Sequence, residues 1–244
     1  MWGDRLVNSQ DGRFQMKIEA NDANAHSHVA HVYFEQGKLD DAVRECSEAL
    51  RIQPYEPIFH YDLGIVYAAQ RKLNKAIKEF QKAIEINPNS LEAHYNLALA
   101  YKDLGKLDEA VDEYQKAIRI KQGFLEAHND LGCIFRAQGK SDKAITELQK
   151  ALEINPNDAV VHYNIGVIFG EQGKLDDAIR EFLESIRIKP SFSEAHNNLG
   201  NIFEVQGKPD DAISEYKKAL DINPNFAPAQ ASLNELYQRR KQEI

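Results

Sequence analysis

A regular spacing of prolines is the feature that most restricts how this chain can fold. The sequence numbers of Pro54, Pro88, Pro156, Pro190 and Pro224 differ by 34 or by twice that value. Gln122 occupies the one position that this spacing leaves without a proline, and the adjacent Gly123 can break a helix there instead. Because self-similarity at such a period is typical of stacked structural units, it predicts a repeat array rather than ordinary globular domains.

The period divides the chain into six repeats and two flanking segments. The repeats are 23–56, 57–90, 91–124, 125–158, 159–192 and 193–226, and the flanking segments are 1–22 and 227–244. Counted from the start of each repeat, position 4 is always histidine, position 11 aromatic and position 20 alanine: His26, His60, His94, His128, His162 and His196; Tyr33, Tyr67, Tyr101, Phe135, Phe169 and Phe203; Ala42, Ala76, Ala110, Ala144, Ala178 and Ala212. Position 8 is glycine or alanine throughout, which lets two helix backbones approach closely.

Each repeat carries the signals of two helices joined by a turn. Position 15 is glycine in every repeat except the second, where it is Arg71, and a glycine there predicts a left-handed helix end. Acidic pairs such as Asp40 and Asp41 then open a second helix, where negative charge complements the helix dipole. Asn-Pro-Asn at 87–89, 155–157 and 223–225 ends that helix, because the residue before proline avoids the helical region. The sequence therefore predicts an all-α fold.

The repeat pattern resembles the tetratricopeptide repeat family, whose signature places Trp, Leu-Gly, Tyr, Ala, Phe and Pro at these intervals. The resemblance covers 23–226 and implies an α–α superhelix, a right-handed solenoid of helix-turn-helix units. The chain departs from the signature in having histidine for tryptophan at position 4 and polar starts such as Glu194 to Gly200. This variant is similar to the array of O-linked N-acetylglucosamine transferases and to stand-alone bacterial and archaeal repeat proteins.

The flanking segments continue the repeat phase. In 227–244, Leu233 and Tyr237 lie on one predicted helix face and the remainder is polar, which predicts a solvating capping helix. Within 12–22, Ile18 falls one full period before Ile52, so this stretch is interpreted as the remnant of a preceding helix within an N-terminal extension.

Composition and charge exclude several classes of function. A net charge of -8 and a pI near 5.5 argue against a nucleic-acid partner. Cys46 and Cys133 lack metal-ligand or disulfide spacing, which fits a reducing compartment. Met1 to Phe14 lacks the apolar region of a secretory signal, and no stretch has the length and apolarity of a membrane span. We therefore expect a cytoplasmic protein with no membrane insertion, unless a leader has been removed.

One face of each first helix is not expected to pack against the core of the repeat. At about 100° per residue, positions 2, 5, 6, 9, 12 and 13 lie opposite the core positions 3, 4, 7, 8, 10, 11 and 14. The resemblance implies that this face lines a concave groove that binds an extended peptide or a helix. The candidate groove residues are Tyr61, Asp62, Ile65, Tyr95, Asn96, Leu99, Lys102, Asn129, Asp130, Arg136, Tyr163, Asn164, Asn197 and Asn198.

Each chemical type in this set has a binding interpretation and a plainer one. Tyrosines at position 5 bring contact area with a hydrogen-bonding tip, or they pack on the neighbouring first helix. Asparagines at position 6 can hold a peptide backbone, as the resemblance to the glycosyltransferase array implies, or they are simply solvated. Lys102 and Arg136 could seat an acidic group, or they belong to a solvated charged face. The register of basic and asparagine residues that binds chaperone C-termini in some family members is missing, which disfavours that ligand.

The sequence predicts no catalytic residue, no metal and no cofactor. Position-4 histidines of successive repeats should lie about 8–10 Å apart, too far to share one zinc ion. We expect them in the core with one ring nitrogen hydrogen-bonded. His28 and His31 share a helix face but lack a third ligand. No phosphate loop or nucleophile motif is present.

The predicted function is that of a protein-binding scaffold, not an enzyme, with a protein or peptide partner in its groove. Two alternatives stay open at this point. The array could be the substrate-recruiting part of a larger enzyme such as an O-linked glycosyltransferase, or it could assemble with copies of itself.

Overall fold

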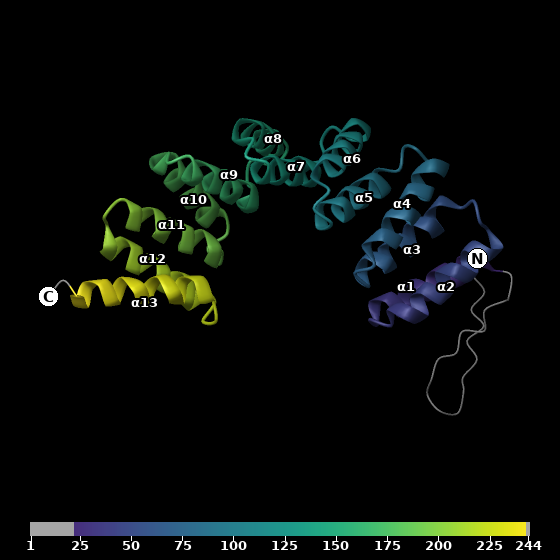
Figure 1. Cartoon of the computed structure of the whole chain (residues 1–244), viewed down its shortest axis with the longest axis horizontal. Coiled ribbons are helices and arrows are strands. Elements are labelled where there is room, and N and C mark those ends of the chain that lie inside the picture. The colour runs from purple at the N-terminus through teal and green to yellow at the C-terminus, as the bar shows by residue number, and fades with distance from the viewer. Residues whose placement is uncertain (1–21, 243–244) are drawn as a thin grey trace, which may run out of the picture. The chain divides into compact units, whose positions relative to one another are not determined.

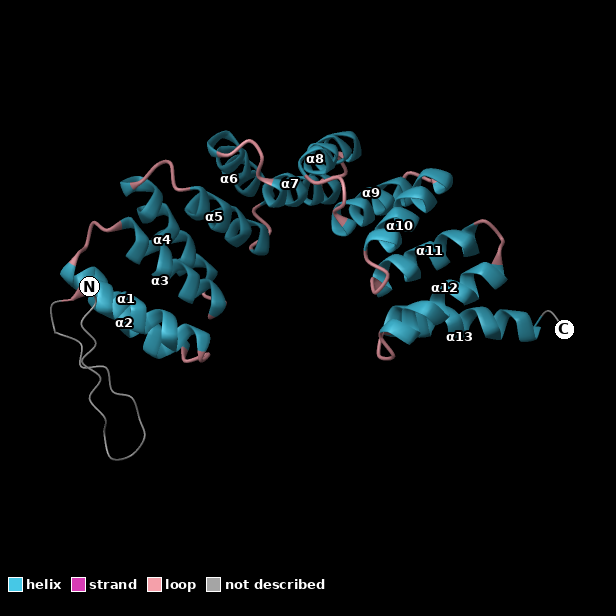
Figure 2. Cartoon of the chain, turned by 180° about the vertical axis from the view of Figure 1, so that it is seen from behind, coloured by secondary structure: helices cyan, strands magenta, loops and turns pink. Residues whose placement is uncertain are grey.

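The computed structural model describes residues 22–242, which form thirteen helices and no strand (Figures 1 and 2). The helices are α1 Ala23–Glu35, α2 Leu39–Ile52, α3 Pro57–Ala69, α4 Leu73–Ile86, α5 Leu91–Asp103, α6 Leu107–Ile120, α7 Leu125–Ala137, α8 Ser141–Ile154, α9 Ala159–Glu171, α10 Leu175–Ile188, α11 Ser193–Val205, α12 Pro209–Ile222 and α13 Ala227–Gln242. The chain divides into two compact units at residues 121 and 122, the first holding α1–α6 and the second α7–α13. The all-α prediction is confirmed.

The turn within each hairpin has the left-handed backbone that the glycines predicted. Gly37, Gly105, Gly139, Gly173 and Gly207 have φ between 71° and 74°. Arg71 adopts the same conformation with φ 58°, so the second repeat keeps the turn without its glycine. In the first turn the Lys38 amide donates to the Tyr33 carbonyl at 2.9 Å, which is the bond that closes a Schellman helix end.

In the second, fourth, fifth and sixth hairpins, the two helices pack where a glycine at position 8 faces a large side chain at position 24. A Cβ atom added to Gly64 would lie 2.5 Å from Cε1 of Phe80, and one added to Gly200 would lie 2.6 Å from Cε1 of Tyr216. Those distances are too short for two carbon atoms in contact. In these hairpins the absence of a side chain on the glycine therefore leaves room for the ring. The close approach expected from position 8 is confirmed.

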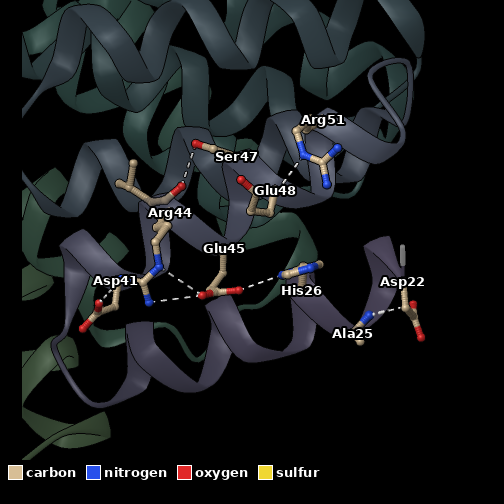
Figure 3. A network of polar contacts seen from close by, with 10 residues as sticks. Asp22, Ala25, His26, Asp41, Arg44, Glu45, Ser47, Glu48 and Arg51 are labelled. Carbon is tan, nitrogen blue, oxygen red and sulfur yellow. Dashed lines mark hydrogen bonds and ion pairs between the residues drawn. The ribbon is translucent and has the colours of Figure 1, made fainter. Parts of the chain in front are cut away.

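A histidine–glutamate pair also joins the two helices of every hairpin. The position-4 Nδ1 atom lies 2.6–2.8 Å from a carboxylate oxygen at position 23, in the pairs His26–Glu45, His60–Glu79, His94–Glu113, His128–Glu147, His162–Glu181 and His196–Glu215. Figure 3 shows the first pair, in which Glu45 also accepts from Arg44. The expected ring hydrogen bond is confirmed, and its glutamate partner is new.

Four of these rings have a second partner. Nε2 of His60, His94, His128 and His162 lies 3.0–3.1 Å from the backbone carbonyl six residues earlier. Both neighbours of such a ring are acceptors, so it donates to both only when both nitrogens carry a proton. The ring thus ties the end of the preceding repeat to the hairpin core.

The helix α13 closes the second unit. Leu233 and Leu236 are buried against Ala212 and Tyr216 of α12, whereas Tyr237 is 38% exposed. The buried side of the capping helix is therefore formed by Leu233 and Leu236 instead of Leu233 and Tyr237. The predicted remnant helix over 12–22 falls outside the described residues except for Asp22, whose side chain caps α1 by accepting from the Ala25 amide at 3.0 Å.

Candidate functional site

Within each of the two units, the first helices of neighbouring repeats meet in a constant register. A side chain at position 5 contacts the side chain at position 6 of the next repeat. In the first unit, Asn96 Nδ2 donates to the Tyr61 hydroxyl at 3.1 Å. In the second unit, Asn164 Nδ2 donates to Asn129 Oδ1 at 2.8 Å, and Asn198 Nδ2 donates to the Tyr163 hydroxyl at 3.0 Å. The polar groups expected to face a peptide therefore also bond one another.

The position-5 tyrosines pack on the second helix of their own hairpin, and Tyr163 also packs on Phe192 at the start of the next first helix, with ring centroids 5.0 Å apart. The ring centroids of Tyr61 and Phe80 are 5.9 Å apart, and those of Tyr163 and Phe182 are also 5.9 Å apart. The ring centroids of Tyr95 and Tyr114 are 5.7 Å apart, in an edge-to-face arrangement. Burial raises the pKa of both Tyr61 and Tyr163. These side chains are half-buried, and the hydroxyls of Tyr61 and Tyr163 contact the position-6 asparagine of the next repeat.

The asparagines differ in which of their side-chain groups could still bond a ligand. Asn96 Nδ2 also donates to the Glu92 carbonyl at 2.9 Å, so its carboxamide oxygen is the group left for a ligand. Asn197 is buried, with 6% of its surface exposed, and its Oδ1 has no partner among the described residues. Its Nδ2 donates to Asn198 Oδ1 at 3.3 Å. As it stands, Asn197 is not accessible to a peptide.

The two predicted basic residues lie in different units. Arg136 donates to Glu171 of the next repeat at 2.8 Å. An acidic ligand would compete with that carboxylate. Lys102 is half-buried on α5. The glutamate at position 13 of the fifth repeat was missed from the sequence, because the register between repeats was unknown.

The apolar and acidic candidates are half-buried. Leu99 lies on α5 and Asp130 on α7. Ile65 and Asp62 line a cavity of about 370 Å³ in the first unit, whose other walls come from α1, α2 and α3: Ser27, His28, Ala30, His31, Phe34, Cys46, Tyr61 and Val66. Asp62 Oδ2 accepts from Ser27 Oγ at 3.0 Å, the same register of positions 5 and 6. Burial raises the pKa of Asp62, and the Ser27 hydrogen bond and nearby His31 and His28 partly oppose this shift.

The described part of the chain contains neither a cluster of metal ligands nor a helix that could span a membrane. Across residues 22–242, no three His, Cys, Asp or Glu side chains are grouped so as to hold a metal ion. His31 instead pairs with Glu35 one turn along α1, at 3.2 Å. None of the helices within the same range combines the length and apolarity needed to cross a bilayer.

Comparison with known proteins gives a family match and structural neighbours. Models described as "TPR repeat" match residues 30–71, 67–105, 132–173 and 168–207, and models described as "Tetratricopeptide repeat" match 91–124 and 193–226. A comparison with curated proteins found no match.

Three solved structures illustrate the likeness. YrrB, described as "a TPR protein with an unusual peptide-binding site", aligns with a TM-score of 0.60 and 23% identity over 77% of this chain and 96% of its own. MamA aligns with a TM-score of 0.62 and 28% identity over 68% of this chain and 96% of its own. PilF from Pseudomonas aeruginosa aligns with a TM-score of 0.72 and 17% identity over 87% of this chain and 97% of its own. The predicted α–α superhelix class is confirmed.

Proposed function

This chain belongs to the tetratricopeptide repeat family, and from that premise we propose that it is a non-catalytic scaffold whose first-helix face binds a peptide segment of a partner protein. The family is generally one of interaction scaffolds. The observation that carries the proposal is the first-helix face itself. It presents half-buried tyrosine rings, apolar side chains and amide oxygens at a constant register in each unit.

This combination suits a peptide. Aromatic rings supply contact area at little cost in rotamer entropy, and they are already held by their packing on the second helix. The carboxamide oxygen of Asn96 is available to accept from a peptide amide. YrrB, a protein of the same fold, is described as having an unusual peptide-binding site, which supports a peptide as the class of ligand.

A capture experiment tests the proposal. The immobilised full chain is compared with the Leu99→Glu variant, in which a charge is placed on the first-helix face of α5. The matched control is Leu183→Glu, because Leu183 is 49% exposed on the second helix α10. Circular dichroism first verifies that both variants are folded. Captured proteins are then identified by mass spectrometry.

We expect the wild type and Leu183→Glu to retain the same partner and Leu99→Glu to lose it. Retention by both variants would move the interaction away from the first-helix face. Loss by Leu183→Glu alone would assign it to the second helices. Sedimentation of the purified chain over a range of concentrations tests self-assembly separately, since a constant monomer mass would exclude it.

A further inference from the structure

The cavity between α1, α2 and α3 lies where the first repeat has small residues at positions 5 and 24. In the second and fifth repeats, the position-5 tyrosine packs on the position-24 phenylalanine, as in Tyr61 with Phe80 and Tyr163 with Phe182. In the first repeat these positions are Ser27 and Cys46. Neither side chain fills the space that a ring fills elsewhere, and the cavity of about 370 Å³ lies at this point.

The cavity occupies a core position at which no large side chain is present. Ala30 and Cys46 line the cavity and are buried, with 2% and 1% of their surfaces exposed. Phe34, Ile65 and Val66 supply apolar sides. Its volume is at the small end of the range for ligand pockets, which is about 300–1,000 Å³. One large aromatic side chain fits within this space.

A carboxylate stands where the internal rings place their hydroxyl groups. Asn96 and Asn198, at position 6, hydrogen-bond the hydroxyl of the preceding repeat's tyrosine. The equivalent residue at the cavity is Asp62, which only accepts, and its described donor is the Ser27 hydroxyl at 3.0 Å. The incoming group must bring a hydrogen-bond donor, and charge complementarity with Asp62 in a chain of net charge -8 disfavours an acidic one.

We propose that this cavity takes a tyrosine side chain of the partner peptide, with the ring against Cys46 and Phe34 and the hydroxyl donating to Asp62. This inference rests on the proposed function, since it assigns one residue of the ligand. A phenylalanine fills the space but leaves Asp62 without a new donor. A lysine or arginine reaches Asp62 but leaves the space for a ring unfilled. The chain's own Tyr61 and Tyr163 place their hydroxyls beside the position-6 residue of the next repeat in the same way, but there the hydroxyl accepts from an asparagine amide.

Peptide pools with one fixed residue test the inference on the full chain. Fluorescein-labelled nine-residue pools carry Tyr, Phe, Arg or Ala at the centre and neutral random flanks, and binding is followed by fluorescence anisotropy. The Tyr pool should bind about 10- to 100-fold more tightly than the Phe pool, as expected for a hydrogen bond to a charged group. The Phe pool should in turn bind more tightly than the Ala pool, because its ring is buried.

Two variants link the preference to the cavity. Ser27→Tyr gives the first repeat the position-5 tyrosine found in the second, third and fifth repeats, so it should remain folded while abolishing the preference for Tyr. The matched control is Ser47→Tyr on the exposed side of α2, which should keep the preference. Asp62→Ala should bring the Tyr and Phe pools to equal affinity and leave both above the Ala pool.

Other outcomes would overturn the assignment. Tightest binding of the Arg pool would make the cavity a cation site, and equal or absent binding of all pools would exclude a tyrosine pocket. An unchanged preference in Ser27→Tyr would place the ring elsewhere. Dissociation of a dimer by the Tyr pool would assign the cavity to a second copy, with the 82% exposed Tyr55 as the first residue to replace. The capture experiment with Leu99→Glu judges the scaffold function independently of these results.

Discussion

Two glycines of α9 receive the same substitution with opposite expected results. Gly166 faces Phe182, and an added Cβ would lie 2.8 Å from Cε1 and 2.9 Å from Cδ1 of that ring. Gly170 lies one turn further, where an added Cβ would meet only Cδ1 of Ile202, at 3.4 Å. Both changes replace glycine by alanine within one helix, so both gain helix propensity of up to about 1 kcal/mol. They differ mainly in the space available to the methyl group.

The expected free energies follow from that difference. Gly170→Ala should stabilise the fold by about 0.5 kcal/mol, because it lies in the last turn of the helix, where propensity counts less. Gly166→Ala crowds a ring that is 1% exposed, and overpacking of a core costs about 1–3 kcal/mol. The third repeat has Ala98 at position 8 and Tyr114 at position 24, both fully buried, which shows that an array can be built around this pairing. We therefore expect a net loss of about 1 kcal/mol at Gly166.

Thermal unfolding followed by circular dichroism measures the difference. A change of about 1 kcal/mol moves the melting midpoint of a chain of this size by about 2–4 °C. Gly166→Ala should melt below the wild type and Gly170→Ala slightly above it, about 3–6 °C apart. If Gly166→Ala melted together with Gly170→Ala or above it, the argument that glycine at position 8 makes room for the position-24 ring would be refuted.

Three further predictions concern the hairpin joints and the cavity. His94→Ala should lower stability by about 2–4 kcal/mol, because it leaves Glu113 and the Pro88 carbonyl without their buried partner, whereas Lys116→Ala should change the urea midpoint little. Gly105→Ala should cost about 1 kcal/mol by the same assay from backbone strain alone, since φ is 74° and no atom lies within 4 Å of the new Cβ; an unchanged midpoint would contradict this. Burial raises the pKa of Cys46 to about 12 from 9.0, so its contribution to stability is complete below about pH 9 and lost as the pH rises towards 12. In a Cys133→Ser background, iodoacetamide at pH 9 should therefore label Cys46 far more slowly in the folded protein than in urea, and equal rates would show that the thiol is not protected.

The hairpins could be predicted from the sequence because their determinants are local. Turn glycines, acidic helix starts and Asn-Pro-Asn each act within a few residues, so the repeat period was enough to place them. The buried histidines were identified as core residues for the same reason. Their partner was missed although the signal was present, since position 23 is glutamate in all six repeats: Glu45, Glu79, Glu113, Glu147, Glu181 and Glu215.

The candidate site was less predictable because it depends on how one repeat packs on the next. Helical periodicity gives the face on which Tyr61 and Asn96 lie but not the register of 35 residues that brings them together. The cavity required a comparison of sizes at positions 5 and 24, which identifies Ser27 and Cys46 as the small pair. The recurrence of histidine in every repeat carried no information on either feature.

The histidine–glutamate pairs and the contacts between neighbouring first helices span 19 and 35 residues. A chain held together at these short separations has a low contact order, which favours fast folding. Each hairpin can close once both of its helices have left the ribosome, and the next repeat docks on a surface that is already formed. Adding a repeat therefore lengthens the protein without lengthening the conformational search, so folding time is expected to depend little on the number of repeats.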